Sequence, residues 1–396
     1  MRVLIAHNAY RSENPSGENR VVESDAEMLR ARGHYVVTYV RSSDELDAWG
    51  PVARAGLPLR AFRSTDADDH VLDVVRRESI DVVHVHNPYP LVGLGFVGEL
   101  RRRGVPTVQT VHNFRHVCMK GTFFRDGRPC TDCVGSRARA AGVLHGCYRD
   151  SRAQSVVMAA TLARHDRVWD EVSRFLAVSP FVAEHLVRFG IPASRVVYKP
   201  NAVVEPPHAA TTTRAGLLFV GRLQQEKGYD VLLDAWELAG LGSRTTLTLA
   251  GGGPDLDAVR RRASGMTSVQ VLGDLVPEEV SALMAETEAL IVPSRWFEGF
   301  PRVIVEAFAL GTPVLASALG SLAAVVTPEV GWLAPPDTPS LAAALHVVVG
   351  DPEQARRRGQ AARALYELSY VPEVVTAQLE GVYADACREL SCGPTA

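Results

Sequence analysis

The sequence predicts an α/β protein made of two doubly wound domains, each built on a parallel sheet. Short apolar runs alternate with amphipathic stretches along the chain, an arrangement typical of parallel sheets covered by helices. Most of these runs are rich in β-branched residues and lack strict alternation, as expected for strands buried on both faces. The 396 residues are long for one domain, and 46% hydrophobic residues are enough for two cores.

In the first half, six apolar runs predict strands, and residues 21–32 and 69–78 carry helical periodicity. The predicted strands are Val3–Ala6, Tyr35–Val40, Asp81–His86, Pro106–Thr110, Arg174–Val178 and Arg195–Tyr198. A second series of six runs occupies the second half. These strands are Gly216–Val220, Thr245–Ala250, Val269–Leu272, Ala289–Pro293, Pro313–Ala316 and Trp332–Ala334.

The proline- and threonine-rich segment 204–214 separates the two series and predicts a linker. We therefore expect a first domain over 1–203 and a second over 215–370. The final segment, 371–396, is expected to form a helix that packs back toward the first domain. A cysteine-rich insertion, 118–147, falls within the first domain.

Charge and hydropathy exclude several classes of function. A net charge of −3 gives no general attraction to nucleic acid or anionic lipid. No apolar run approaches the length needed to cross a membrane. The N-terminal MRVLIAHNAY predicts a first strand rather than a signal peptide. We expect a cytoplasmic protein, with a peripheral membrane position left open.

The most informative stretch begins at Glu298, where an apolar strand has ended and a helix starts near Pro301. Proline is tolerated in a first helical turn, where its missing N–H would have no partner. The helix dipole and the free amides at this end favour an anion, and Glu306 lies one turn further on. The amides concerned belong to Gly299, Phe300, Arg302 and Val303.

Two carboxylates beside an anion site would repel a phosphate unless they bind something else. Sugar hydroxyls are suitable partners, so the pattern indicates a nucleotide sugar. Arg222 and Lys227 follow the strand Gly216–Val220, at the edge where doubly wound sheets bind ligands. Two fixed cations there would stabilise a departing diphosphate. Ordinary surface charges on a solvated loop are the alternative for these two residues.

The sequence resembles the retaining glycosyltransferases of family 4. The resemblance covers nearly the whole chain and is carried by four motifs in the family's order. These are EGFP…EAFA-x-G-x-PV from Glu298, GRL…EKG from Gly221, Ser16-Gly17-Glu18, and TVHN over 110–113. Ser16 departs from the family's usual glycine. The resemblance implies the GT-B fold, in which two Rossmann-like domains face a central cleft.

The resemblance also implies roles for individual residues. Glu306 would bind the ribose, Glu298 the donor sugar, and Gly17 would lie in a loop over the diphosphate. The expected donor-binding set is Gly17, Arg222, Lys227, Glu298, Gly299, Phe300, Val303 and Glu306, and the expected catalytic set is His112, Arg222, Lys227 and Glu298.

His112 ends a strand at the expected cleft, where the family's histidine touches the donor sugar. His86 and Asn87 end the preceding strand and are expected on the acceptor side, whereas His84, inside that strand, is expected to be packed.

The function expected from this resemblance is retaining transfer of a sugar from a nucleoside diphosphate to an acceptor hydroxyl. The acceptor is a glycan, a lipid-linked sugar or a small metabolite, and the reaction is a same-face displacement that requires no cofactor or catalytic metal. A nucleotide-sugar epimerase and a non-catalytic binding partner remain alternatives. A dehydrogenase is disfavoured, because residues 7–20 lack G-x-G-x-x-G.

Four cysteines, Cys118, Cys130, Cys133 and Cys147, have spacing compatible with a structural zinc site. Free thiols and disulfides are the alternatives. Two Asp-x-Asp triplets, at 66–68 and 255–257, directly precede helical stretches and are interpreted as helix caps rather than metal ligands.

Overall fold

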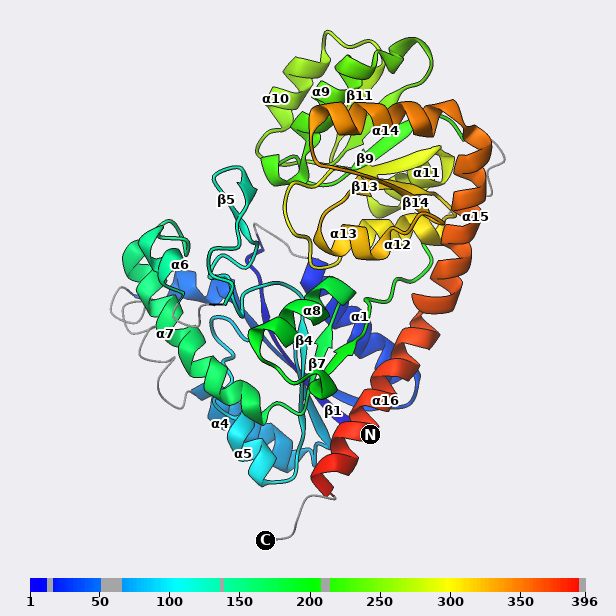
Figure 1. Ribbon diagram of the computed structural model, residues 1–396. Helices are drawn as coiled ribbons and strands as arrows, with labels where there is room; N and C mark the ends of the chain where they lie inside the picture. The colour runs from blue at the N-terminus through cyan, green and yellow to red at the C-terminus, as the bar shows by residue number, and fades with distance from the viewer. Residues whose placement is uncertain (13–16, 51–65, 136–138, 208–213, 392–396) are drawn as a thin grey trace. The chain divides into compact units, whose positions relative to one another are not determined.

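The computed structural model describes residues 1–12, 17–50, 66–135, 139–207 and 214–391. The chain divides into two compact units. Unit 1 comprises Met1–Thr122, Thr131–Ala202 and Pro372–Ala396, and unit 2 comprises Phe123–Cys130 and Val203–Val371. Each unit has a sheet of parallel strands with helices packed against it (Figure 1), which confirms the predicted fold class.

The sheet of unit 1 has the strand order β2-β1-β3-β4-β7-β8, and every neighbouring pair is parallel. Its strands are β1 (Arg2–Ala9), β2 (Tyr35–Ser42), β3 (Val82–Val85), β4 (Thr107–Val111), β7 (Arg174–Ala177) and β8 (Val196–Tyr198). The helices of the unit are α1 (Gly17–Ala31), α4 (Asp66–Arg77), α5 (Val97–Arg102), α6 (Ala140–Leu144), α7 (Arg152–Val168), α8 (Pro180–Phe189) and α16 (Pro372–Ser391).

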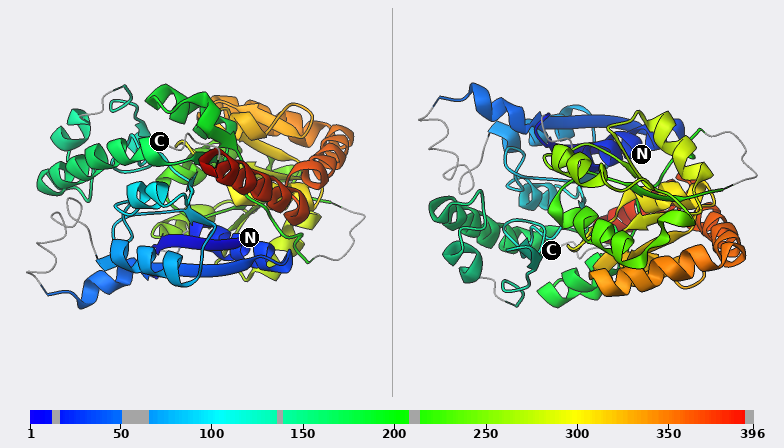
Figure 2. Two further views of the ribbon diagram at one scale, coloured as in Figure 1. Left: turned by 90° about the horizontal axis from the view of Figure 1, so that it is seen from below. Right: turned by 90° about the horizontal axis from the view of Figure 1, so that it is seen from above.

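One face of this sheet is covered by α1 and the C-terminal helix α16, which contact each other. Alternate residues of the strands, including Val3 and Ile5, pack there against Leu29 of α1 and Leu379 of α16. Figure 2 gives two further views of these elements. The last helix of the chain is therefore part of the core of unit 1.

The sheet of unit 2 has the order β11-β10-β9-β12-β13-β14, again with parallel neighbours. Its strands are β9 (Leu217–Val220), β10 (Leu247–Ala250), β11 (Val269–Gly273), β12 (Ala289–Val292), β13 (Val314–Ser317) and β14 (Gly331–Ala334). The helices are α9 (Tyr229–Ala239), α10 (Leu256–Ala263), α11 (Pro277–Glu286), α12 (Arg302–Ala309), α13 (Gly320–Val325), α14 (Thr338–Gly350) and α15 (Pro352–Ser369).

Two apolar clusters cover the opposite faces of this second sheet. Leu217 and Ile291 belong to a cluster with α9 and α14, whereas Leu218 and Leu290 belong to one with α12 and α15. Successive side chains of a strand point to opposite faces of the sheet, so both faces are buried only when consecutive residues are apolar. This is why the strands read as unbroken apolar runs.

Each sheet has one place where the strand order reverses. In unit 1 the order changes direction between β1 and β3, and in unit 2 between β9 and β12. Ligands of doubly wound sheets bind beyond the carboxyl ends of the strands at such a point. The loops after β1, β3, β9 and β12 are therefore the places to look for a site.

Each predicted strand is present, with ends within three residues of the expected ones. The helix expected over 21–32 begins earlier, at Gly17. A short antiparallel hairpin, β5 (Phe124–Arg125) with β6 (Arg128–Pro129), lies inside the cysteine-rich segment. The sequence assigned this segment to the first domain, whereas the structure groups residues 123–130 with unit 2. None of the described helices is both long enough and apolar enough to span a membrane.

Candidate active site

The loop after β12 in unit 2 holds Glu298, which is buried, with 6% of its surface exposed. The Lys227 ammonium lies 2.6 Å from Glu298 Oε1, and the Ser294 hydroxyl donates to the same oxygen at 2.8 Å. Two residues expected from the sequence to act on one donor are thus in direct contact.

Burial by itself would raise the pKa of Glu298. The positive charge of Lys227 and the hydrogen bonds from Lys227 and Ser294 outweigh burial and lower the pKa. Glu298 is therefore ionised at neutral pH and can accept hydrogen bonds from hydroxyl groups.

Lys227 ends a 3-10 turn, Gln225–Lys227, in the loop after β9. The next residue, Gly228, has φ +73°, and a Cβ there would lie 1.9 Å from the carbonyl oxygen of Pro293. Only glycine permits this close approach between the β9 and β12 loops. The approach brings Lys227 to Glu298, and it also places the ammonium 5.1 Å from the centre of the Trp296 ring.

Helix α12 starts directly after this loop, with Pro301 at the N-cap and no side-chain hydrogen bond to the cap. Its first amides therefore have no side-chain partner, as an anion-binding helix end requires. Glu306 lies one turn along, partly buried, with its carboxylate 3.5 Å from the Arg302 guanidinium. Arg222, in the loop after β9, is exposed.

The remaining donor-side residues of unit 2 have mixed environments. Gly299 lies in the loop before α12. Phe300 and Val303 are partly buried against the α12–α15 cluster, and the Phe300 ring lies 5.9 Å from the Tyr370 ring. Their side chains serve packing, so any contact with a donor at these two positions falls to the backbone.

In unit 1, His112 follows β4 and is partly buried. Its Nε2 lies 2.9 Å from Nδ1 of His86, and the two rings stack at 5.2 Å. Since Nε2 already has a partner, Nδ1 is the nitrogen of His112 left for a ligand.

The pKa of His112 is lowered to about 3, chiefly by burial and further by the charges of Lys199 and His7. His112 is therefore neutral at physiological pH. It can hydrogen-bond a hydroxyl, but it carries no positive charge to offer a phosphate.

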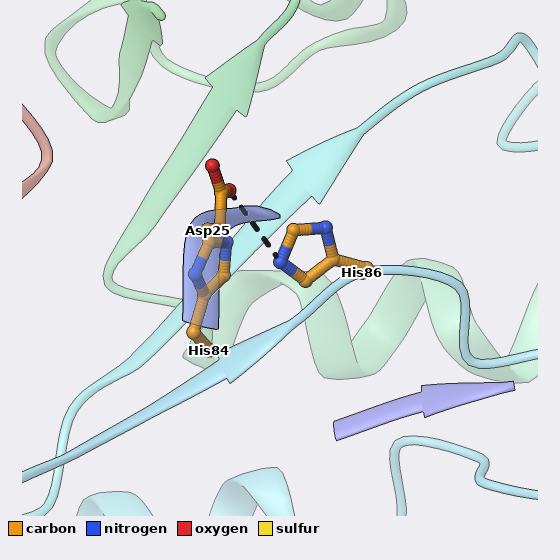
Figure 3. Close-up of side chains that lie close together, drawn as sticks. All are labelled: Asp25, His84 and His86. Carbon is orange, nitrogen blue, oxygen red and sulfur yellow. Dashed lines mark ion pairs between the residues drawn. The ribbon is translucent and has the colours of Figure 1, made fainter. Parts of the chain in front are cut away.

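Behind His112 lies a buried polar group. His86 is 2% exposed, and its Nε2 lies 3.9 Å from Asp25 Oδ2 (Figure 3). Both oxygens of Asp25 accept hydrogen bonds from the fully buried ammonium of Lys199, at 2.9 and 3.0 Å. The carboxylate of α1 and the lysine after β8 thus neutralise each other inside the unit.

Asp25, His84 and His86 are a group whose ligand atoms lie within 4.8 Å of one another. Their hydrogen bonds argue against a metal ion there. Lys199 already balances the charge of Asp25, and both ring nitrogens of His84 are used, by Tyr383 and by Thr110 at 2.7 Å each. The group is a hydrogen-bonded network, and His84 is packed as the sequence predicted.

Gly17 begins α1 instead of lying in a loop before it, and Ser16 lies outside the described residues. The first turn of α1 is tied to the β4 loop, because Asn113 Nδ2 donates to Glu18 Oε1 at 2.8 Å. Asn87 is buried and donates to the carbonyl of Asn8 at 2.8 Å. Its side-chain amide is thus occupied with the β1 end.

The four cysteines of the insertion form no disulfide with one another. Among the described residues, the group of close metal-ligating side chains is Asp25, His84 and His86, which includes no cysteine. The zinc site stays a prediction.

The interpretation of the two Asp-x-Asp triplets as helix caps is wrong in detail. Asp255 stands at the N-cap of α10 without a capping hydrogen bond, and its side chain bonds to Tyr229. Asp66 and Asp68 lie in the first turn of α4.

Ser294, Asp25 and Lys199 were not predicted from the sequence. Asp25 had a recognisable signal, because it shares a helical face with Val21, Val22 and Leu29, which are all buried. A carboxylate on an apolar stripe predicts a buried partner. Lys199 and Ser294 follow apolar strands, but no local pattern distinguishes them from other loop residues.

Family models match both halves of the chain. Residues 16–202 match the glycosyl transferase 4-like domain, and residues 205–365 match glycosyl transferases group 1. Among solved structures, Anabaena Alr3699/HepE in complex with UDP has a TM-score of 0.68 at 17% identity, over 97% of this chain and 100% of that one. Sucrose-phosphate synthase (tll1590) from Thermosynechococcus elongatus has a TM-score of 0.68 at 20% identity, over 98% and 99%. These likenesses support the GT-B fold.

Curated relatives align over most of their length. Glycogen synthase from Mycobacterium tuberculosis is 34% identical, over 98% of this chain and 95% of that protein. D-inositol 3-phosphate glycosyltransferase from Rhodococcus jostii is 30% identical, over 88% and 81%. The chain therefore belongs to the group 1 glycosyltransferases with a glycosyl transferase 4-like N-terminal half, and it is a glycosyltransferase.

Proposed function

We propose that the enzyme transfers a sugar from a nucleoside-diphosphate sugar to an acceptor hydroxyl, with retention of the anomeric configuration. The observation that carries this proposal is the Lys227–Glu298 pair at the carboxyl edge of unit 2, 2.6 Å apart and next to the uncapped N-terminus of α12. A cation, an ionised carboxylate and helix amides without side-chain partners thus lie together where the strand order reverses between β9 and β12.

Each of these groups matches one part of the donor. Lys227 and Arg222 neutralise the diphosphate, and the dipole of α12 adds to them. Glu298 accepts hydrogen bonds from sugar hydroxyls through Oε2, because Lys227 and Ser294 share Oε1. Glu306, one turn into α12, accepts from the ribose hydroxyls. Relatives named for UDP and UDP-glucose complexes support a nucleotide sugar as donor.

The charge balance explains how the diphosphate departs. As the bond from the anomeric carbon to the phosphate oxygen breaks, negative charge builds on the diphosphate beside fixed cations, which need no rearrangement. We propose that these cations do the work that a divalent metal performs in other glycosyltransferases. The departing oxygen then takes the proton of the acceptor hydroxyl, which attacks the same face of the sugar.

Unit 1 supplies the acceptor surface in this proposal. His112 is neutral and offers Nδ1 to a hydroxyl group, with its ring held by His86. A neutral group positions a hydroxyl without attracting the diphosphate, so its contribution is orientation.

The test is turnover of the full chain with nucleoside-diphosphate sugars and a panel of hydroxyl acceptors, followed by proton NMR of the product. The proposal expects a glycoside with the anomeric configuration of the donor and unchanged turnover in excess EDTA. An inverted product would overturn retention, and EDTA-sensitive turnover restored by a divalent cation would overturn the role of Lys227 and Arg222. An epimerised free donor would favour the epimerase alternative. Donor binding without any turnover would favour a non-catalytic partner.

A further inference from the structure

Beside the hollow that His112 lines, unit 1 contains a larger cavity of about 330 Å³, and more cations than carboxylates line it. Arg11, Arg115, Lys120 and Arg149 line it, against one carboxylate, that of Asp150. The cavity shares Asn87, Tyr89 and Arg115 with the smaller hollow that His112 lines. It therefore lies next to the histidine proposed to face the acceptor.

The cations of this cavity are mostly without counter-ions. Arg11 is neutralised by Asp47, 2.8 Å away. Across the described ranges, Arg115, Lys120 and Arg149 form no ion pair. Arg149 stands 5.4 Å from the centre of the Tyr148 ring, and Arg115 stands 5.9 Å from that of Tyr89.

Arg115 is the most informative of the three, because it is partly enclosed by the protein. Its Nε is buried and has no hydrogen-bond partner among the described groups. The nearby carboxylate of Glu18 accepts a hydrogen bond from Asn113 and burial raises the pKa of Glu18; its charge acts on Arg115, but the two side chains form no salt bridge among the described contacts. An enclosed guanidinium without a direct ion-pair contact is costly, since it stays charged at any physiological pH.

We propose that this cavity binds a phosphate group on the acceptor. The inference rests on the proposed transferase function and names the class of its second substrate. A phosphate monoester carries close to two negative charges at neutral pH. Among the side chains that line the cavity, three unpaired cations face the carboxylate of Asp150, and Glu18 also lies near Arg115, so the cavity has a net positive charge that favours the dianion of a phosphate monoester over a carboxylate.

The phosphate binds with its oxygens toward the planar fork of Arg115, which suits two parallel hydrogen bonds. Lys120 and Arg149, both exposed, add charge at the rim. The rest of the acceptor reaches from Arg115 into the hollow that His112 lines, where a hydroxyl meets Nδ1 of His112.

The first experiment measures binding of inorganic phosphate to the full chain by calorimetry. Wild type should bind phosphate, and Arg115→Ala should lose at least about tenfold in affinity, as expected for hydrogen bonds to a charged group. Arg188→Ala is the matched control, because it removes an exposed arginine of unit 1 that pairs with Glu184 on its own helix. Equal phosphate affinity in wild type and Arg115→Ala would overturn the proposal.

The second experiment compares transfer to acceptors that differ only in a phosphate group. Wild type should prefer the phosphorylated member, and Arg115→Ala should reduce that preference in kcat/KM at least about tenfold. If Arg115→Ala fails to fold, the double variant Lys120→Ala, Arg149→Ala changes only exposed residues and should reduce the preference severalfold. Equal use of both acceptors by wild type would overturn the proposal.

Two further arms identify the source of the phosphate. Binding to phosphatidylcholine vesicles only when they contain phosphatidylinositol 4-phosphate, which carries a phosphate monoester, would assign it to a lipid headgroup, and preference for a soluble sugar phosphate would assign it to a small acceptor. Competition separates this site from the donor site. If a nucleoside diphosphate displaces inorganic phosphate completely, the cavity binds the donor's diphosphate and the acceptor assignment fails, while the proposed function stands.

Discussion

The reversal points of the two sheets have opposite electrostatic character. In unit 2 the groups are charged: Lys227 faces an ionised Glu298, and Arg222 is exposed nearby. In unit 1 the groups behind His112 are neutral or paired internally, because burial lowers the pKa of the histidines and Lys199 balances Asp25, whereas Arg115 lies to the side of His112 in the same hollow. The same type of sheet thus provides a charged edge and a neutral one.

This difference has a physical reason in the reaction proposed. A departing diphosphate gains negative charge, and fixed cations stabilise it most where they need not move. An acceptor hydroxyl gains little from a full charge and more from a group held in one orientation. The cationic cavity of unit 1 lies beside the neutral histidine, where a charged substituent could be bound separately from the reacting hydroxyl.

The largest effect is expected from Lys227→Ala, which removes charge from the charged edge. Turnover should fall by about 100-fold or more, as for loss of one electrostatic stabiliser of a transition state. The variant should also lose about 1–3 kcal/mol of stability, because Glu298 is left buried without its cation.

The double variant Lys227→Ala, Glu298→Gln separates these two effects. It removes the unpaired charge, so it should recover most of the stability measured by urea unfolding while turnover stays low. Full turnover in folded Lys227→Ala would show that the charge of this edge is not used in catalysis.

Acid should destabilise unit 1 before unit 2. Burial is the leading cause that lowers the pKa of seven histidines, all in unit 1: His7, His84, His86, His112, His116, His165 and His185. The unfolded chain therefore binds more protons than the folded one below about pH 6.5, and stability falls as pH falls. Glu18, whose pKa burial raises, opposes this trend by one proton at most.

Each such histidine contributes up to about 1.4 kcal/mol per pH unit, so unit 1 should lose at least about 2 kcal/mol by pH 5.5. Glu298, with its lowered pKa, stabilises unit 2 above the unfolded pKa and loses that effect only at lower pH. Hydrogen exchange measured by mass spectrometry at pH 7.5 and pH 5.5 would locate the loss. Earlier loss of protection in β9–β14 than in β1–β8 would contradict the comparison.

Glu306→Ala should have a smaller effect that is confined to the donor. Loss of hydrogen bonds between a carboxylate and the ribose should raise the donor KM by about tenfold or more. Glu353→Ala is the control, because Glu353 is an exposed helical acid paired with Arg356 and Arg357. Equal donor KM in both variants would remove Glu306 from the site.

The smallest effect concerns the cysteines. If Cys118, Cys130, Cys133 and Cys147 hold zinc, the purified protein should contain about one zinc per chain, and Cys133→Ser should lose it with little change in donor affinity. Elemental analysis measures this directly. Protein without zinc and with four thiols titratable after denaturation would favour reduced cysteines.

The sequence predicted the strands well, because most are short apolar runs, and the central strands of both sheets, such as β3 and β12, are buried on both faces. It also predicted residues that lie in one site: Lys227 and Glu298 are 71 positions apart and are in contact. The environment of a residue was harder to predict. His86 lines the same hollow as His112, as an acceptor-side residue would, but its contact with the His112 ring was not predicted, since the pairing of parallel strands, rather than local pattern, places β3 beside β4.

Pairings across the fold account for most of what could not be predicted. The Asp25–Lys199 pair joins α1 to the end of β8, and nothing in the sequence indicates that these two residues, 174 positions apart, are in contact. The cations of the larger cavity in unit 1 come from three separate loops, which follow β1, β4 and α6. Such clusters depend on tertiary packing, whereas strands and helix starts depend on neighbours along the chain.

Donor binding by the charged edge is tested most directly by thermal unfolding of the full chain with nucleoside diphosphates and their sugars. A ligand bound only by the folded state adds about 2.7 kcal/mol of stability at 100 times its dissociation constant. We predict a clear rise in Tm with one nucleotide base in wild type and a much smaller rise in Lys227→Ala. No rise with any nucleoside diphosphate in folded wild-type protein would contradict it.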